Sequence, residues 1–513
     1  MAKLSREEII KEDLKRLHEL GYKQELARSM SGFTNFAISF TIISVLAGTL
    51  TMFGFGLNAA GTASLAYGWP IVSVFALMVG LSMAEIVSAY PTAGGLYYWS
   101  SKLGGPSWGW FTAWFNVIGQ VAVTAGIDYG LAMFIDALLN QYFPVIPATD
   151  HAGTLATLVI YAVILLAQAY INSLGINFVS MLNNISAWWH IVGVFLIAGL
   201  LLFFAPHHAQ PLSFIFNGQF TTTTGFPSWY GFLLGLLVTA YTITGFDASA
   251  HVSEETEGAS RTAPKGIIMS IVISAIAGYI LIIGLLVAMP EMSDTLGATN
   301  PVLYIFNTGL GETVGTLLFL VVIVAQFFCG TASITSNSRM MFAFARDGGM
   351  PGSKTLYKLS DRHVPLNALI VSIVATFILA LPALFSTVIY SAVVSIAAIA
   401  LYIAYVTPVF LRLVHKDRFK VGPWNLGKWS PLVGWLAIGW TIFGAVIFML
   451  PVATPITVAN FNFTGVVFVI VWLILIPWYM LSVRHWFKGP KSAFDDKKDL
   501  DYVAPDQHHH HSV

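Results

Sequence analysis

The chain has 513 residues, of which 56% are hydrophobic and 10% are charged, and this excludes a fully wetted surface because a soluble domain carries about 25% charged residues. Equal numbers of basic and acidic residues, 25 of each, exclude the strongly basic profile of a nucleic-acid-binding protein. The single cysteine, Cys329, excludes a disulfide framework and a cysteine-rich metal site, and the composition as a whole predicts an all-α protein that crosses a lipid bilayer many times.

A charged segment, residues 1–34, precedes the first apolar stretch and includes Glu7, Lys11 and Arg16. We expect it to form a short amphipathic helix on the cytoplasmic face, where it is either a solvated cap or a gating element. It lacks the short basic tip and small-residue cleavage site of a signal peptide, so no cleavable signal is expected.

Twelve stretches of the chain have the length and apolar character of membrane spans, since a helix needs about 20 mostly apolar residues to cross the bilayer core. They lie at 36–57, 66–89, 110–138, 154–173, 184–205, 229–252, 267–289, 314–338, 367–386, 389–411, 432–452 and 464–482. Cytoplasmic loops retain lysine and arginine, and all 25 of these residues fall in inside segments if the N-terminus is inside. The sequence therefore predicts that both termini are cytoplasmic.

The first span carries Gly48, Gly54 and Gly56 among hydroxyl-bearing residues near its middle. Small residues of this kind allow close packing between helices. Alternatively, they form an unwound joint whose free amides, at the positive end of a half-helix, hold an anionic group.

The third span carries a polar stripe of Asn116, Gln120, Thr124 and Asp128, which recur every four residues and therefore lie on roughly one helix face. The stripe either bonds neighbouring helices or lines a pocket. The fifth span carries His190, which is either a hydrogen-bonded structural residue or a proton carrier, because histidine can change its charge near neutral pH.

The sixth span is the most polar in its middle. An otherwise apolar helix there holds Tyr241, Thr242, Thr244, Gly245, Asp247, Ser249 and His251. Non-helical backbone at membrane depth is tolerated only where it lines a cavity or is buried in protein, so we expect a second break here. Spans one and six lie five apart, and a five-plus-five inverted repeat would bring the two breaks together at the bilayer midplane.

The eighth span has hydroxyl residues in one half, among them Ser333 and Ser336. Such hydroxyls often bond their own helix backbone, so the cluster is weak evidence for an ion site. The ionisable residues inside spans are few and scattered: Glu85, Asp128, Asp136, His190, Asp247 and His251. They form no convergent set of acids, bases or metal ligands, so we expect neither an enzyme nor a metal site.

Six motifs occur in a characteristic order along the chain: Leu81–Glu85, Tyr90–Tyr98, Gly245–Asp247, Ser253–Glu255, Arg261–Pro264 and Ser338–Gly348. Together they resemble the amino acid–polyamine–organocation transporter superfamily. The long first span and the run Gly119–Tyr129 look most like its amino acid/choline branch, which includes GABA and choline permeases. The resemblance implies ten core helices in an inverted repeat, with broken helices one and six, and two peripheral helices.

The resemblance also implies a division of the chain. The segments are an N-terminal segment at 1–34, a first repeat at 35–206, a second repeat at 207–413, a peripheral pair of helices at 414–486 and a cytoplasmic tail at 487–513. The tail is polar, and its histidine run, His508–His511, is either native or a tag and receives no metal-binding role.

Roles at the candidate site follow from the resemblance one position at a time. The first joint, which in the family receives the substrate carboxylate, corresponds to Ala47, Gly48, Thr49 and Leu50, with Leu50 replacing a usual glycine. The substrate amine is expected on carbonyls of the sixth span, and the residues carried over there are Tyr241, Thr242, Thr244, Gly245 and Asp247. Tyr241 matches an aromatic lid, while Asp247 stands where an acidic residue more often organises the broken helix than touches the ligand.

Gln120 and Thr124 fall where relatives line the pocket, and His190 falls where some relatives carry a lysine beside a vacant sodium site. The resemblance therefore implies coupling to a proton at His190, while sodium coupling through Ser333 and Ser336 stays open.

We expect a secondary active transporter in the plasma (inner) membrane that moves a small amino acid or an amine such as GABA by alternating access, without a cofactor. The alternatives are a choline or polyamine permease, an amino-acid exchanger, and a nutrient sensor that binds the same ligand without transporting it. A choline site would need an aromatic cage for the quaternary ammonium.

Overall fold

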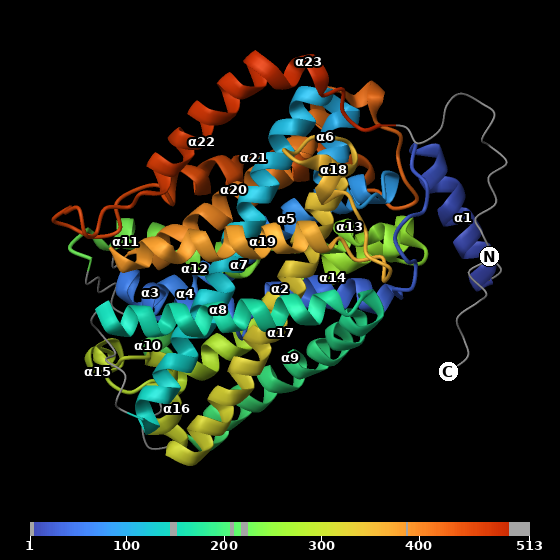
Figure 1. Cartoon of the computed structure of the whole chain (residues 1–513). Helices are drawn as coiled ribbons and strands as arrows, with labels where there is room; N and C mark the ends of the chain where they lie inside the picture. The colour runs from blue at the N-terminus through green and yellow to red at the C-terminus, as the bar shows by residue number, and fades with distance from the viewer. Residues whose placement is uncertain (1–4, 144–150, 206–209, 217–223, 386–387, 492–513) are drawn as a thin grey trace.

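The computed structural model describes residues 5–143, 151–205, 210–216, 224–385 and 388–491, and this part of the chain is helical without a β-strand (Figure 1). The predicted tail beyond residue 491, with its histidine run, lies outside the described residues.

The first half contains α1 (Arg6–Glu19), α2 (Gly32–Ile43), α3 (Gly48–Ala60), α4 (Ala63–Ala66), α5 (Gly68–Ala89), α6 (Leu96–Gly104), α7 (Pro106–Tyr142), α8 (His151–Ser173), α9 (Ile176–Phe204) and α10 (Leu212–Phe216). The second half contains α11 (Ser228–Gly235), α12 (Leu237–Thr242), α13 (Ala248–His251), η1 (Ser253–Glu255), α14 (Ala259–Ala288), α15 (Met292–Gly297), α16 (Pro301–Leu310), α17 (Glu312–Arg346), α18 (Ser353–Leu356), α19 (Leu366–Ala380), η2 (Leu381–Leu384), α20 (Ile389–Val414), η3 (Lys416–Arg418), η4 (Gly427–Trp429), α21 (Ser430–Ile447), α22 (Thr464–Trp478), the π-helical η5 (Tyr479–Val483) and α23 (Arg484–Trp486).

The predicted membrane fold is confirmed. Among the described residues, 11 helical stretches are long and apolar enough to cross a membrane, and α2 with α3 count as one of them. The predicted span at 229–252 is not among them because it is divided into the short helices α11, α12 and α13. Together with this interrupted segment, the long helices account for the twelve expected spans.

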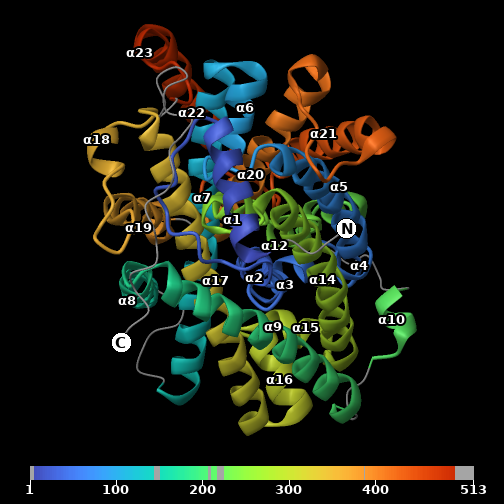
Figure 2. The same cartoon turned by 90° about the vertical axis from the view of Figure 1, so that its right-hand side faces the viewer.

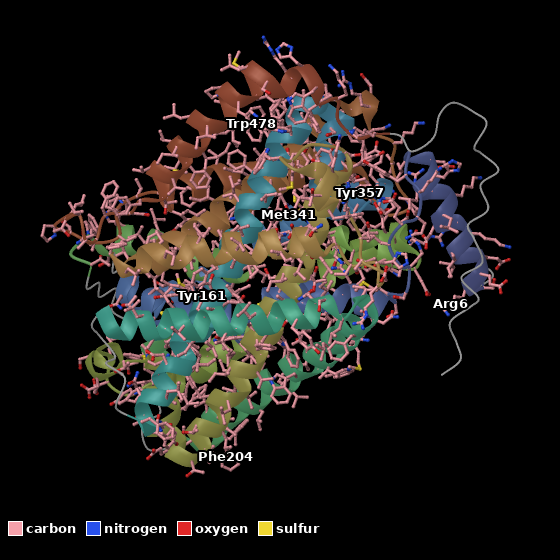
Figure 3. All side chains as sticks on the ribbon, viewed as in Figure 1. Arg6, Tyr161, Phe204, Met341, Tyr357 and Trp478 are labelled. Atoms are coloured by element: carbon pink, nitrogen blue, oxygen red, sulfur yellow. The ribbon has the colours of Figure 1, made fainter. Side chains whose placement is uncertain are left out.

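Burial separates central helices from peripheral ones. In the most apolar window of each span, 89% of the residues of α2–α3 are buried, compared with 17% in the span that contains α22. Both views place α2 and α3 in the middle of the bundle, while α22 and α23 form one of its edges (Figures 1 and 2). The outer faces carry large exposed apolar side chains such as Phe204, which is 66% exposed, as a surface facing lipid requires (Figure 3).

The N-terminal segment is helical, as predicted, but it is not a solvated cap throughout. Arg28 and Asp13 are each 8% exposed and form an ion pair with a separation of 3.4 Å. Burial raises the pKa of Asp13, and Arg28 offsets this only in part. Met30 pairs with Thr256 in an isolated parallel bridge, so the segment after α1 is fastened to the chain that follows α13. Part of the segment is therefore docked onto the bundle, and its gating role stays a prediction.

Candidate functional site

The first span is broken between α2 and α3, at residues 44–47. Ser44 has a positive φ of 25°, and its hydroxyl accepts a hydrogen bond from the amide of Ala47 at 3.1 Å. The break lies one turn before the position that the sequence indicated, since Gly48, Thr49 and Leu50 form the first turn of α3. The prediction that these residues are themselves unwound is therefore wrong, because the chain turns at Ser44 and resumes the helix at Gly48.

The sixth span is broken at residues 243–247, where the sequence predicted it. Gly245 has a φ of +86°, which a residue with a side chain rarely adopts. Two tyrosines of α20 satisfy backbone groups that the break frees: the hydroxyl of Tyr402 donates to the carbonyl of Ile243 at 2.9 Å, and the amide of Gly245 donates to the hydroxyl of Tyr405 at 3.0 Å. Neither tyrosine belongs to a polar cluster in the sequence of α20, so the sequence does not predict them as site residues.

The two breaks touch each other, as the inverted-repeat argument predicted. A methyl group placed on Gly48 would lie 2.7 Å from the Thr242 hydroxyl and 2.9 Å from the Thr242 Cα, and one placed on Gly245 would overlap the Ile42 side chain. The Ser39 hydroxyl donates to the carbonyl of Phe246 at 3.0 Å. Glycine at position 48 is therefore required by the close approach of the other break, rather than by unwinding of its own backbone.

The first turn of α3 presents hydrogen-bond donors to the junction of the breaks. In the described part of the chain, the amides of Thr49 and Leu50 have no hydrogen-bond partner, and neither has the Thr49 hydroxyl. These amides lie at the positive end of a helix dipole, where an anionic group is favoured. This geometry is compatible with a carboxylate site at Thr49 and Leu50, and the site expected from Ala47 to Leu50 stays a prediction.

The sixth-span break presents acceptors beside these donors. Among the described residues, the carbonyls of Thr242 and Thr244 have no hydrogen-bond partner, whereas the Tyr241 carbonyl accepts from the Thr244 hydroxyl at 2.7 Å. All three residues are at most 3% exposed. Donors for an anion and acceptors for an ammonium group thus meet in one buried place, which suits a zwitterion.

Asp247 is held by protein groups from three helices. Its Oδ2 atom accepts from Gln120 Nε2 at 2.8 Å and from Asn116 Nδ2 at 3.3 Å, and lies 3.1 Å from His251 Nε2. Its Oδ1 atom accepts from the Tyr405 hydroxyl at 2.8 Å. The carboxyl group therefore fastens the break to α7 and α20, which agrees with an organising role better than with direct contact to a ligand.

The remaining candidates of the eighth span separate into two groups. The hydroxyls of Thr124 and Ser333 share a hydrogen bond of 2.7 Å, so the structure brings the stripe of α7 and the hydroxyl cluster of α17 together. The Ser336 hydroxyl is buried and has no partner among the described residues, and the structure does not join it to Ser333.

His190 contacts the first break directly. Its Nδ1 atom lies 2.8 Å from the Ser186 carbonyl, which can only accept, so Nδ1 carries the proton in the neutral ring. Its Nε2 atom lies 2.7 Å from the Ser44 hydroxyl, which then donates to it. The sequence does not predict Ser44 as a site residue, because it is only one of several hydroxyl-bearing residues in the first span.

Two buried ion pairs fasten the end of the sixth span to α17. Arg339 binds Glu255 through contacts of 2.8 and 3.2 Å, and Arg346 binds Glu254 through contacts of 3.0 and 3.1 Å. Burial by itself would raise the pKa of the Glu254 carboxyl. Arg346 and the amide of Ala93 together outweigh this effect, so the pKa lies below its ordinary value. The Arg339 and Glu255 side chains are each 1% exposed.

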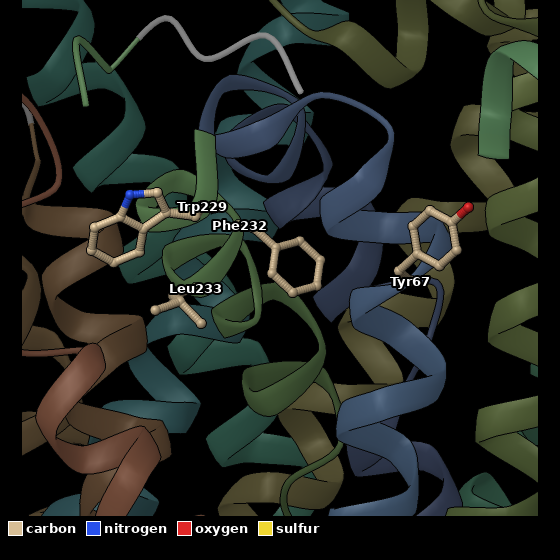
Figure 4. A pocket seen from close by; sticks show the side chains of 4 residues that line it. All are labelled: Tyr67, Trp229, Phe232 and Leu233. Carbon is tan, nitrogen blue, oxygen red and sulfur yellow. The ribbon is translucent and has the colours of Figure 1, made fainter. Parts of the chain in front are cut away.

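A separate apolar pocket of about 480 Å³ lies away from these residues, lined by Tyr67, Trp229, Phe232 and Leu233 (Figure 4). None of the candidate site residues lines it, and it offers no cluster of polar groups for a charged ligand.

The chain is similar to known proteins along most of its length. A sequence profile of the family described as "Amino acid permease" matches residues 30–474. The Arabidopsis thaliana protein "Amino-acid permease BAT1" is 43% identical and covers 93% of this chain and 96% of its own length. Its rice homologue is 41% identical, with coverages of 94% and 96%. The "GABA-specific permease" of Saccharomyces cerevisiae is 29% identical, with coverages of 96% and 88%.

Proposed function

The chain belongs to the amino acid permease family, which makes it a transporter and not an enzyme, and from this premise we propose that it moves a small amino acid or GABA across the plasma membrane together with a proton. The observation that carries the proposal is the close approach of the two breaks, with unpartnered amides at Thr49 and Leu50 on one side and unpartnered carbonyls at Thr242 and Thr244 on the other. The printed name of the yeast relative supports GABA as a first candidate.

The substrate carboxylate binds the first-turn amides of α3, and the substrate amine binds the carbonyls of the sixth-span break. Peptide dipoles replace water around both charges, which is how broken helices bind zwitterions inside a membrane. The lid is Tyr241, whose hydroxyl is buried without a partner among the described residues. Choline lacks a carboxylate and therefore fits this arrangement less well.

His190 is the proposed site of the coupling proton. In the neutral ring, the Ser44 hydroxyl donates to Nε2 and accepts from the Ala47 amide. Protonation places a hydrogen on Nε2, so the Ser44 hydroxyl has to turn its own hydrogen towards another acceptor. The protonation state of His190 therefore changes the hydrogen bonding of Ser44 in the first break, three residues before the proposed carboxylate site begins at Ala47.

Alternating access then requires the two breaks to separate from the scaffold on one side at a time. The Arg339–Glu255 and Arg346–Glu254 pairs, together with the docked N-terminal segment, close the proposed cytoplasmic side in this conformation. A ligand shifts such an equilibrium only by binding one state better than the other. The proposed divisions at 35–206 and 207–413 correspond to the two repeats that carry one break each.

A thermal-shift screen of the purified protein, followed by flux of the radiolabelled hits into proteoliposomes, tests this function. Amino acids or GABA should raise the melting temperature with their concentration, by the equivalent of about 2.7 kcal/mol at 100 times the dissociation constant. Flux of the same compound should follow an imposed proton gradient. Stabilisation by choline or polyamines alone would overturn the zwitterion site, and binding without flux would indicate a sensor.

A further inference from the structure

A second carboxyl group, that of Asp128, is buried in the span formed by α7. Asp128 is fully buried at 0% exposure, and its Oδ1 atom accepts a hydrogen bond of 2.8 Å from Gln168 Nε2 of α8. Its Oδ2 atom has no partner in the described part of the chain. Gly330 of α17 closes the site, since a methyl group there would overlap both Asp128 Oδ1 and Gln168 Nε2.

Asp128 differs from the other deeply buried acidic residues. Each of the others that are at most 2% exposed has two or more donors or an arginine: Glu85, Asp247, Glu254, Glu255 and Asp347. Asp128 has one neutral amide donor and, within the described residues, no cation. An ionised carboxylate without a partner is strongly disfavoured inside a membrane.

The groups around Asp128 do not supply the missing positive charge. The titratable side chains close enough to be affected by a charge on Asp128 are Tyr161 of α8, Tyr241 of α12 and Cys329 of α17, and none of them is cationic near neutral pH. Cys329, the neighbour of Gly330, donates to the carbonyl of Ile42 at 3.2 Å, two residues before Ser44 of the first break. Asp128 therefore lies near the same break as His190, but on the side of α7 and α17.

We propose that Asp128 is a second proton-carrying residue of the transport cycle, protonated in the conformation described here and deprotonated when the two breaks move away from α7 and water reaches its carboxyl group. In the second step the O–H bond of the carboxyl group breaks, a water molecule that enters between the helices takes the proton, and a hydrated carboxylate remains. The inference rests on the proposed transport function. With His190, it gives two protons per substrate molecule.

Infrared spectroscopy of the protein in lipid tests the protonation without transport. Wild-type protein at neutral pH should show the carbonyl stretch of a protonated carboxylic acid, which Asp128→Asn lacks and the matched variant Asp136→Asn, on the same helix, retains. Asp128→Asn keeps a carbonyl oxygen that accepts from Gln168. If Asp128→Asn fails to fold, Asp128→Glu replaces it in the experiment and should shift the band. A wild-type spectrum without a band that depends on Asp128 overturns the inference.

The coupling ratio tests the role in the cycle, because a purely structural side chain would not change it. In proteoliposomes, the pH gradient that just balances a substrate gradient should give two protons per substrate for wild type and Asp136→Asn, and one for Asp128→Asn. An unchanged ratio in Asp128→Asn overturns the inference while the proposed function stands. Absence of flux in wild type would instead overturn the proposed function, and the infrared result would still decide whether Asp128 is protonated.

Discussion

Replacing Gly48 by alanine tests whether the two breaks have to touch for the substrate to bind. The added methyl group would lie 2.9 Å from the Thr242 Cα, whereas ordinary contacts begin near 3.4 Å. The backbone of α3 or α12 therefore has to move by about 0.5 Å, and overpacking of this kind costs about 1–3 kcal/mol. The penalty falls on the closed arrangement, because separation of the breaks relieves it.

Since each 1.4 kcal/mol corresponds to a tenfold change, Gly48→Ala should weaken substrate binding by about 5-fold to 150-fold. Affinity is measured by thermal shift and by the concentration dependence of uptake in proteoliposomes. The matched control is Gly439→Ala on α21, where an added methyl group meets nothing within 4 Å. Wild-type affinity in Gly48→Ala would refute the reasoning, because the breaks would then not need to approach each other as described.

Three further outcomes are expected. His190→Ala should abolish the pH dependence of uptake in proteoliposomes, and an unchanged pH profile would remove His190 from the coupling mechanism. Arg339→Met leaves Glu255 buried without its partner and should destabilise the protein by about 3–5 kcal/mol, seen as a lower melting temperature that Arg339→Met combined with Glu255→Leu partly restores. Folding lowers the pKa of Glu254. Its carboxylate therefore stabilises the folded protein at any pH above the pKa of the unfolded state, which is about 4.3, and this stabilisation is lost as the pH falls below that value. The melting temperatures of wild type and Glu254→Gln should therefore converge on acidification, and a gap that widens at low pH would contradict this sign.

The spans and the second break could be predicted because their signals are local. A stretch of about 20 apolar residues has to be a membrane helix, whatever its neighbours are. The sequence of Tyr241 to Asp247 contains a glycine and a carboxylate where an unbroken helix has no use for them, and the break lies at 243–247.

The first break lies one turn before Gly48 because a glycine in a span is compatible both with close helix packing and with an unwound joint, and the local sequence does not distinguish the two. Gly48 is helical, and its missing side chain makes room for Thr242, a residue almost 200 positions away in the chain. The turn itself is at Ser44, whose hydroxyl bonds the Ala47 amide and His190. No local pattern distinguishes this serine from the other hydroxyl residues of the same span.

The sequence by itself determined that the chain lies in a membrane, how many times it crosses, and which spans carry polar groups that lipid would not tolerate, since these are properties of each stretch alone. Only the tertiary structure decided which of those groups are satisfied. Asp247 and Asp128 are both acidic residues in apolar spans, yet one meets donors from α7, α13 and α20 and the other meets a single amide. The difference arises because hydrogen bonds depend on distances of about 3 Å between side chains, and helices far apart in the chain set those distances only when they pack.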